Sequence, residues 1–177
     1  AAGYNIIIIE TVGVGQSEIS INNLVDFTIL LMISGAGDEL QGIKRGIIEF
    51  ADAIIVNKAD GENKSNAINT SIQYKNTVDL LNLNREKPIH VGYCSSINNE
   101  GIQSIWKLIN NDIIKIKSNN KFNQNRQKQE IFWLHKRIKD DLGLRKYEKL
   151  IRSKKINELE HELNTNNDTL DNIINKL

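Results

Sequence analysis

Four short runs of apolar and β-branched residues, separated by longer segments, constrain the fold of this chain most strongly. The runs occupy residues 5–10, part of 24–33, residues 53–56 and residues 89–93. Such runs are typical of strands buried on both faces, as in a parallel sheet. Because helix-length segments lie between them, the pattern predicts an α/β protein with a doubly wound parallel sheet. Ligands of such sheets bind at the carboxyl ends of the strands, so the residues after each run are the candidates for chemistry.

The segments between and after these runs carry apolar residues at helical spacing. We expect helices over residues 41–50, 64–83 and 102–116. Residues 127–142 predict a fourth helix, and residues 170–177 a last short one. The apolar face of the fourth helix is formed by Ile131, Leu134, Ile138 and Leu142.

Charge and glycine are unevenly distributed. The net charge is −5 over residues 1–114, +10 over residues 115–155 and −4 over residues 156–177, and these add to the overall +1. Seven of the 11 glycines lie in the first 46 residues. We therefore predict an α/β part over residues 1–118 and a helical extension over residues 119–177, with the boundary in an Asn-rich stretch.

Composition argues against several classes of protein. The single cysteine, Cys94, excludes a disulfide framework. The apolar runs are shorter than ten residues, too short for a membrane span, so we expect no membrane partner. Few aromatic residues accompany the basic block, which favours a solvated helical surface over a nucleic-acid site.

The first run ends in Glu10, and Gly13 and Gly15 follow it. An acid at a strand tip followed by Gly-x-Gly suits a site for Mg²⁺ and phosphate. The carboxylate can hold the metal or its water, and a glycine lets a backbone N–H approach a phosphate oxygen. A tight strand–helix turn would explain the glycines but not the acid.

The second run ends in the sequence S-G-A-G-D-E-L-Q-G-I-K at residues 34–44. One interpretation is a glycine-rich connector in which Asp38 caps the next helix. The other is a mobile switch segment. The residues alone favour the connector.

The third run ends in Asn57-Lys58-Ala59-Asp60, and N-K-x-D after a buried strand is the guanine-reading loop of GTPases. The Asp60 carboxylate can accept hydrogen bonds from the N1–H and the exocyclic amine of guanine. Adenine offers no such pair of donors, so this aspartate would select guanine. The Lys58 stem can cover the base, and Asn57 can tie loops together.

The fourth run leads into Cys94, Ser95, Ser96 and Ile97. In GTPases a turn of small residues at this point brings a backbone N–H to the guanine carbonyl oxygen, and Ser95, Ser96 and Ile97 are placed for that contact. We expect Cys94 to be a small buried residue and not a nucleophile, since no paired histidine lies nearby in the sequence.

The phosphate-binding signature G-x-x-x-x-G-K-[ST] does not occur in the 177 residues. In GTPases that loop lies upstream of the strand expected at residues 5–10, and the chain begins with Ala1. We therefore expect that the N-terminal part of the protein is not in this chain.

The runs E-T-V-G-V-G-Q-S-E, G-A-G-D-E-L-Q-G-I-K and N-K-A-D-G strongly resemble the methylmalonyl-CoA mutase-associated GTPases, over roughly residues 1–145. Some bacterial members were formerly described as lysine/arginine/ornithine transport system kinases. The family consists of dimeric P-loop GTPases that gate the delivery of adenosylcobalamin to methylmalonyl-CoA mutase and protect that enzyme. The resemblance implies that residues 1–118 are the C-terminal part of a GTPase domain, and that residues 119–177 are a possible dimerisation arm.

The resemblance also assigns residues. Glu10 would be the Mg²⁺-linked acid, and Gly15 the γ-phosphate sensor, with Gln16 beside it as a further catalytic candidate. Residues 35–44 would be an extra switch loop that signals to the mutase and stimulates hydrolysis. Its candidate actors are Asp38, Glu39, Gln41 and Lys44, while Asn57, Lys58, Asp60, Ser95, Ser96 and Ile97 would bind the guanine.

In the helical extension Trp133 could anchor a dimer contact, or it could pack locally against the α/β part; the sequence supports both equally. His135 lies among Lys and Arg and is expected at the surface.

The leading hypothesis is a GTP-hydrolysing switch that uses GTP/GDP and Mg²⁺, serves methylmalonyl-CoA mutase or a related cobalamin-dependent mutase, and forms a homodimer. We expect it in the cytoplasm, or in the mitochondrial matrix of a eukaryote. A nickel-insertion GTPase is an alternative, although three scattered histidines and one cysteine argue against a metal relay. A non-catalytic interaction module is another, if the phosphate-binding loop is natively absent.

Overall fold

The computed structural model describes residues 3–11, 21–34, 45–81, 87–165 and 169–177. Its centre is a parallel sheet of β1 (Ile29–Ile33), β2 (Ala53–Asn57) and β3 (His90–Tyr93), in the order β1-β2-β3. Ala53 of β2 is level with Ile29 on one side and with His90 on the other. The carboxyl ends of all three strands therefore meet at one edge. The α/β fold with a parallel sheet is confirmed.

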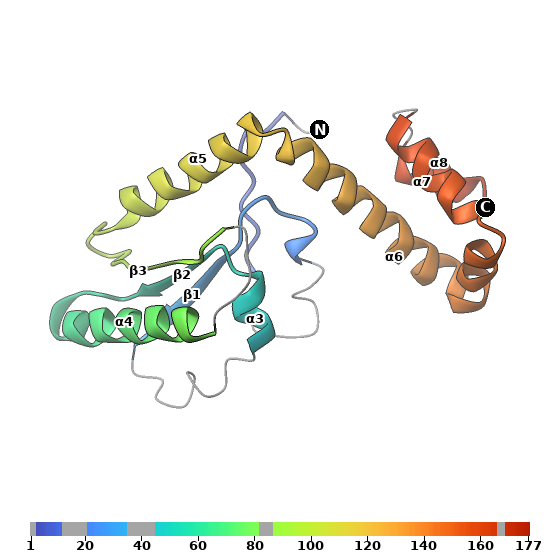
Figure 1. Cartoon of the computed structure of the whole chain (residues 1–177). Helices are drawn as coiled ribbons and strands as arrows, with labels where there is room; N and C mark the ends of the chain where they lie inside the picture. The colour runs from blue at the N-terminus through green and yellow to red at the C-terminus, as the bar shows by residue number, and fades with distance from the viewer. Residues whose placement is uncertain (1–2, 12–20, 35–44, 82–86, 166–168) are drawn as a thin grey trace.

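The central strand β2 shows why the sheet needs helices on both faces (Figure 1). Its residues 53–56 are all buried. Ile54 and Val56 lie in a cluster with residues of α4 (Lys64–Leu80), whereas Ala53 and Ile55 face α5 (Ile102–Ser118). Because successive side chains of a strand point to opposite faces, a run of four apolar residues requires two apolar layers.

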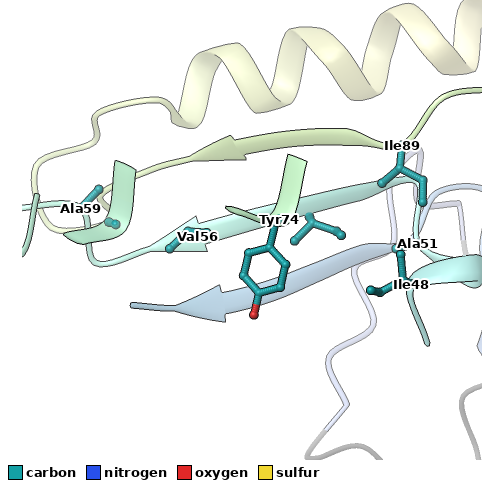
Figure 2. Close-up of a cluster of buried hydrophobic side chains, with 8 residues drawn as sticks. Ile48, Ala51, Val56, Ala59, Tyr74 and Ile89 are labelled. Carbon is teal, nitrogen blue, oxygen red and sulfur yellow. The ribbon is translucent and has the colours of Figure 1, made fainter. Parts of the chain in front are cut away.

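The larger of the two layers lies between the sheet and α4, and Tyr74 fills its centre with its ring almost fully buried (Figure 2). The short helix α3 (Arg45–Phe50) precedes β2, and the short helix η1 (Gly61–Asn63) follows the loop after β2. The labelled members of this cluster are Ile48, Ala51, Val56, Ala59, Tyr74 and Ile89.

The strand predicted at residues 5–10 is wrong for this structure. These residues form no regular element, and their side chains are exposed, to 73% for Ile7 and 87% for Ile8. A strand gains stability only from neighbouring backbone and a covering apolar layer. Among the described residues, the sheet comprises β1, β2 and β3 alone, and residues 5–10 pair with none of these strands.

The helical extension forms a second hydrophobic cluster, away from the sheet. It consists of α6 (Lys121–Arg152), α7 (Lys155–Thr165) and α8 (Leu170–Asn175), with α7 and α8 packed against the far half of α6 (Figure 1). Gly143 leaves the helical conformation inside α6, with φ of 79° and ψ of 160°. The buried members of this cluster are Leu134, Ile138, Leu150, Ile156, Leu159, Leu163 and Ile173.

Trp133 packs locally, as one of the two interpretations held. Its indole N–H donates to the carbonyl oxygen of Asn23 at 2.8 Å. Beside it, Arg126 pairs with Asp26 at 2.5 Å. The near half of α6 is thus bound to the segment that precedes β1.

His135, expected at the surface, is partly exposed, with 24% of its side chain accessible, but it is also engaged within the chain. Its Nδ1 lies 2.8 Å from the Tyr147 hydroxyl and its Nε2 lies 2.7 Å from a Glu160 carboxylate oxygen. Since Glu160 belongs to α7, this network joins α6 to α7.

Among the described residues, no helix has the length and apolarity that crossing a membrane requires.

Candidate functional site

The N-K-A-D sequence leaves the carboxyl end of β2, as the pattern predicts, and Asn57 organises the loops there. Oδ1 of Asn57 accepts a hydrogen bond from the N–H of Lys58 at 2.8 Å and another from the N–H of Ser96 at 3.2 Å. The first bond stabilises the turn at Lys58, whose φ of 60° is left-handed. The second joins the loop after β2 to the loop after β3, so the expected tie between loops is present.

Asp60 lies beside Ser95, which is completely buried. The Ser95 hydroxyl donates to Oδ2 of Asp60 at 2.6 Å, and its oxygen accepts from the N–H of Asn98 at 3.1 Å. Within the described part of the chain, Oδ1 of Asp60 accepts no hydrogen bond. The carboxylate is therefore held by one oxygen while the other is available to a ligand.

The turn after β3 is fixed by backbone contacts. The N–H of Ser95 donates to the carbonyl of Glu100 at 3.0 Å, and the N–H of Ala59 donates to the carbonyl of Cys94 at 3.0 Å. Gly101 has a φ of 80°, and a Cβ there would lie 2.8 Å from the carbonyl oxygen of Tyr93, so only glycine fits. Cys94 is buried, as expected, and burial raises the pKa of its thiol.

Ile97 lies in the same turn with its side chain 78% exposed. In the described part of the chain its N–H has no hydrogen-bond partner, whereas the N–H of Ser95 is engaged by Glu100 and that of Ser96 by Asn57. The N–H of Ile97 is thus the first candidate for a ligand at this turn. The N–H of Ser96 is the second, because its bond to Asn57 is long, at 3.2 Å.

Four residues to which the sequence analysis gave no role in the site also support these loops. The Lys64 ammonium pairs with the Glu100 carboxylate at 2.7 Å, and this hydrogen bond raises the pKa of Lys64. The side chain of Asn63 contacts both Lys58 and Ser34. No motif marks these residues, because isolated Lys, Glu, Asn and Ser residues occur throughout the chain.

The structure does not unite all the predicted site residues. It brings Asn57, Asp60, Ser95 and Ser96 together, with Lys58 and Ile97 exposed in the same two loops. Glu10 is exposed, and it makes no hydrogen bond or ion pair with the other described residues. The candidates that lie outside the described residues are Gly15, Gln16, Asp38, Glu39, Gln41 and Lys44.

A second polar cluster lies at the opposite end of the strands. Asp112 of α5 is buried and lies 2.9 Å from the Lys87 ammonium and 3.2 Å from Nε2 of His90. Lys87 also pairs with Asp52 at 3.2 Å, so its charge is shared between two carboxylates. The described residues include no group of three or more His, Cys, Asp or Glu side chains able to hold a metal ion. The ion pairs of this cluster join α5 to the residues at the start of β2 and β3.

Comparisons with known proteins agree with this geometry. A family model described as methylmalonyl Co-A mutase-associated GTPase MeaB matches residues 1–150. The chain is 38% identical over 143 residues to the GTPase ArgK of Escherichia coli (strain K12), which covers 80% of this chain and 43% of that protein. It is 37% identical over 144 residues to the methylmalonic aciduria type A homolog, mitochondrial, of Mus musculus, covering 79% of this chain and 34% of that protein.

A solved structure described as the crystal structure of LAO/AO transport system kinase superposes with a TM-score of 0.70 at 30% sequence identity. The match covers 99% of this chain and 56% of that one. The chain thus spans less than half the length of the two curated relatives and little more than half of the solved one. Because the family model matches most of its residues, the chain belongs to the family of methylmalonyl-CoA mutase-associated GTPases.

Proposed function

We propose that this chain carries the guanine-reading part of a GTPase, and that the whole protein binds and hydrolyses GTP. The observation that carries the proposal is the Asp60 carboxylate, held through Oδ2 by buried Ser95 and open at Oδ1. It lies in an N-K-x-D loop at the carboxyl end of a parallel strand. The N1–H and exocyclic amine of guanine would donate to this carboxylate.

The neighbouring groups have complementary roles in this proposal. Asn57 keeps the loops after β2 and β3 together, and the exposed Lys58 stem covers one face of the base. The N–H of Ile97, or that of Ser96, would donate to the guanine carbonyl oxygen. Ser95 acts on Asp60 and does not need to touch the base.

Hydrolysis needs Mg²⁺ and groups at the phosphates, and here the family membership carries more weight than the geometry. The exposed Glu10 carboxylate, which the other described residues do not engage, is the right chemistry for Mg²⁺. When bound, the metal would neutralise charge developing on the β- and γ-phosphates. We assign Gly15 and Gln16 to the γ-phosphate, and Asp38, Gln41 and Lys44 to the switch loop.

We further propose that the protein acts with methylmalonyl-CoA mutase, or a related cobalamin-dependent mutase, by gating adenosylcobalamin delivery. Family membership supports this assignment and favours it over nickel insertion. It also supports an α/β GTPase part over residues 1–118, and a cytoplasmic or, in a eukaryote, mitochondrial matrix location.

We propose that the extension over residues 119–177 mediates a homodimer. The face of α6 that contains Leu134 and Ile138 is already covered by α7 and α8, and Trp133 is engaged within the chain. The exposed Leu144 and Ile151 of α6 are therefore better candidates for a dimer contact.

The assignment of Asp60 is tested by Asp60→Asn in the full-length protein. The amide presents a donor in place of one accepting oxygen, and xanthine presents a carbonyl in place of the guanine amine. We expect weaker GTP binding and a shift in preference towards xanthosine triphosphate, measured by competition with a labelled nucleotide. Asp79→Asn, an exposed aspartate on α4, is the matched control. Unchanged GTP preference in Asp60→Asn would refute the assignment and favour a non-catalytic interaction module.

A further inference from the structure

Asn63 joins the guanine-reading loop to the end of β1. Its amide nitrogen Nδ2 donates to the carbonyl oxygen of Lys58 at 2.7 Å, and its amide oxygen Oδ1 accepts from the Ser34 hydroxyl at 2.7 Å. Its backbone N–H donates to the carbonyl of Asp60 at 3.0 Å. Asn63 thus contacts the main chain on both sides of Ala59. Through Ser34 it also contacts the end of β1, the strand that lies on the other side of β2 from β3.

We propose that Asn63 is a positioning residue that sets the guanine specificity of Asp60, and that Ser34 supports it by holding its amide oxygen. This inference rests on the proposed function, because it concerns how the same loop recognises a guanine nucleotide. It goes further by naming two residues outside the N-K-A-D motif that determine how well the loop recognises the base.

The side chain of Asn63 is not used to cap α4. Asn63 is the N-cap of α4 and also the last residue of η1, so its φ of −80° and ψ of −10° are already helical, unlike the extended backbone from which an N-cap side chain usually bonds the first turn. This side chain makes no such capping bond. It turns away from its own helix, and both of its polar atoms engage other loops.

The bond to Lys58 has a geometric consequence for Asp60. Lys58 has a φ of 60°, a left-handed conformation that a residue with a side chain seldom adopts. The Asn57 side chain holds the N–H of Lys58, and Asn63 holds its carbonyl. The peptide plane after Lys58 is fixed by these contacts, and with it the direction in which the chain reaches Asp60.

The Lys58 carbonyl and Ser34 together hold the Asn63 amide in one orientation. An amide can rotate by 180° and exchange its oxygen and nitrogen, so its orientation depends on its partners. The Lys58 carbonyl can only accept, so it requires the NH₂ group, and the Ser34 hydroxyl donates to Oδ1 and holds the amide in that orientation. Ser34 directly follows Ile33, the last residue of β1, so a shift at the end of this strand would reach the guanine-reading loop through one side chain.

The test uses the full-length protein and compares GDP with inosine diphosphate, which lacks the exocyclic amine. The variants are Asn63→Ala, Ser34→Ala, both together, and Asn66→Ala as a matched control. Asn66 lies on the first turn of α4 and is exposed, and its side chain makes no hydrogen bond to the other described residues. Affinities are measured by calorimetry and folding by thermal unfolding.

We expect Asn63→Ala to lower the preference for GDP over inosine diphosphate by roughly three- to ten-fold, the range expected for the loss of one hydrogen bond. Ser34→Ala should lower it less, and should change nothing further in the Asn63→Ala background. Asn66→Ala should behave as the wild type. A purely structural role would weaken the two nucleotides equally, because it would not act on the contact with the amine.

An unchanged ratio of the two affinities in Asn63→Ala would overturn the inference, and so would additive effects of the two substitutions. If Asn63→Ala does not fold, Asn63→Asp replaces it: the carboxylate still accepts from Ser34 but faces the Lys58 carbonyl with an oxygen, so the same loss of preference is expected. A wild-type protein that does not prefer GDP to ADP would instead refute the proposed function. Preference lost in Asp60→Asn but retained in Asn63→Ala would refute only the inference about Asn63.

Discussion

The Ser95 hydroxyl donates a 2.6 Å hydrogen bond to Oδ2 of Asp60, although the two residues lie 35 positions apart in the sequence. The bond crosses from the loop after β3 to the loop after β2. Because Ser95 is completely buried, its hydroxyl cannot exchange this partner for water. The orientation of the Asp60 carboxylate is therefore a property of two loops together and not of the N-K-A-D motif alone.

The first prediction concerns this bond. Ser95→Ala in the full-length protein removes the donor to Asp60 and leaves the carboxylate free to turn. Hydrogen bonds to charged groups contribute about 1.5–3 kcal/mol. Since Asp60 is partly exposed, we expect a loss at the lower end, roughly ten-fold in GDP affinity by calorimetry. Ser65→Ala, on the exposed face of α4, is the control. Equal affinities for Ser95→Ala and the wild type would mean that Asp60 is oriented without Ser95.

The second prediction compares two glycines with positive φ. Gly101→Ala places a Cβ 2.8 Å from the Tyr93 carbonyl oxygen, whereas a Cβ at Gly61 meets nothing within 4 Å. Gly61→Ala should cost about 1 kcal/mol of unfolding free energy from backbone strain alone. Gly101→Ala should cost about 2–4 kcal/mol, since the clash adds to the strain. Urea denaturation of both variants gives the difference, and equal losses would show that the turn after β3 relaxes freely.

The sheet illustrates what local sequence can and cannot predict. β1, β2 and β3 all coincide with predicted apolar runs. Residues 5–10 carry an equally good run, yet they form no strand, because a strand depends on backbone partners as well as on its own residues. α7 lies within the predicted helical extension, and the spacing of Ile156, Leu159 and Leu163 fits its buried face, although the sequence analysis gave this helix no bounds of its own.

Part of the candidate site could likewise be predicted from the sequence, and part could not. The N-K-A-D motif and the small-residue turn could be located from sequence, because their residue types and their places after strands are specific. The bridge from Ser34 to Asn63 could not, since the chain contains 24 asparagines and nothing distinguishes this one locally. Such a bridge depends on how three loops meet at the edge of the sheet.

A third prediction concerns Asp112, the buried carboxylate at the end of the strands opposite the candidate site. Asp112→Ala leaves His90 and Lys87 without this partner, although Lys87 retains Asp52. Breaking a fully buried ion pair costs about 3–5 kcal/mol, and the partial exposure of Lys87 and His90 lowers the expected loss to about 1–3 kcal/mol. Chemical denaturation would measure it, with Asp79→Ala on exposed α4 as the control. A loss no larger than that of the control would show that the cluster adds little to stability.

A fourth prediction concerns pH and Cys94. Burial raises the pKa of the Cys94 thiol above its ordinary value, so the folded state holds the proton more tightly than the unfolded chain. The corresponding stability is present below the unfolded pKa of about 8.5 and is lost as pH rises through the folded value. Cys94→Ala should therefore flatten the decline in unfolding free energy above pH 8.5. The native thiol should also react slowly with iodoacetamide at pH 8, and rapid alkylation of the folded protein would contradict this.

The last prediction concerns the 177-residue chain on its own. Ile7 and Ile8 are largely exposed, and on β1 the side chain of Leu31 is 64% exposed. In the described structure β1 pairs only with β2, so its other edge is unpaired. Unpaired edges and contiguous exposed apolar side chains promote association between chains. We therefore expect concentration-dependent self-association in light scattering.

Replacing Ile7 and Ile8 with Asn should reduce this self-association. Ile114→Asn is the comparison and should have a smaller effect, because Ile114 is also exposed but lies on the regular helix α5. The isolated chain should also bind GTP only weakly, since most of the binding energy in P-loop GTPases comes from the phosphate-binding loop, whose signature its sequence lacks. Micromolar or tighter GTP binding by a monodisperse sample would contradict both expectations, and would mean that the phosphates are held by residues other than those of a P-loop.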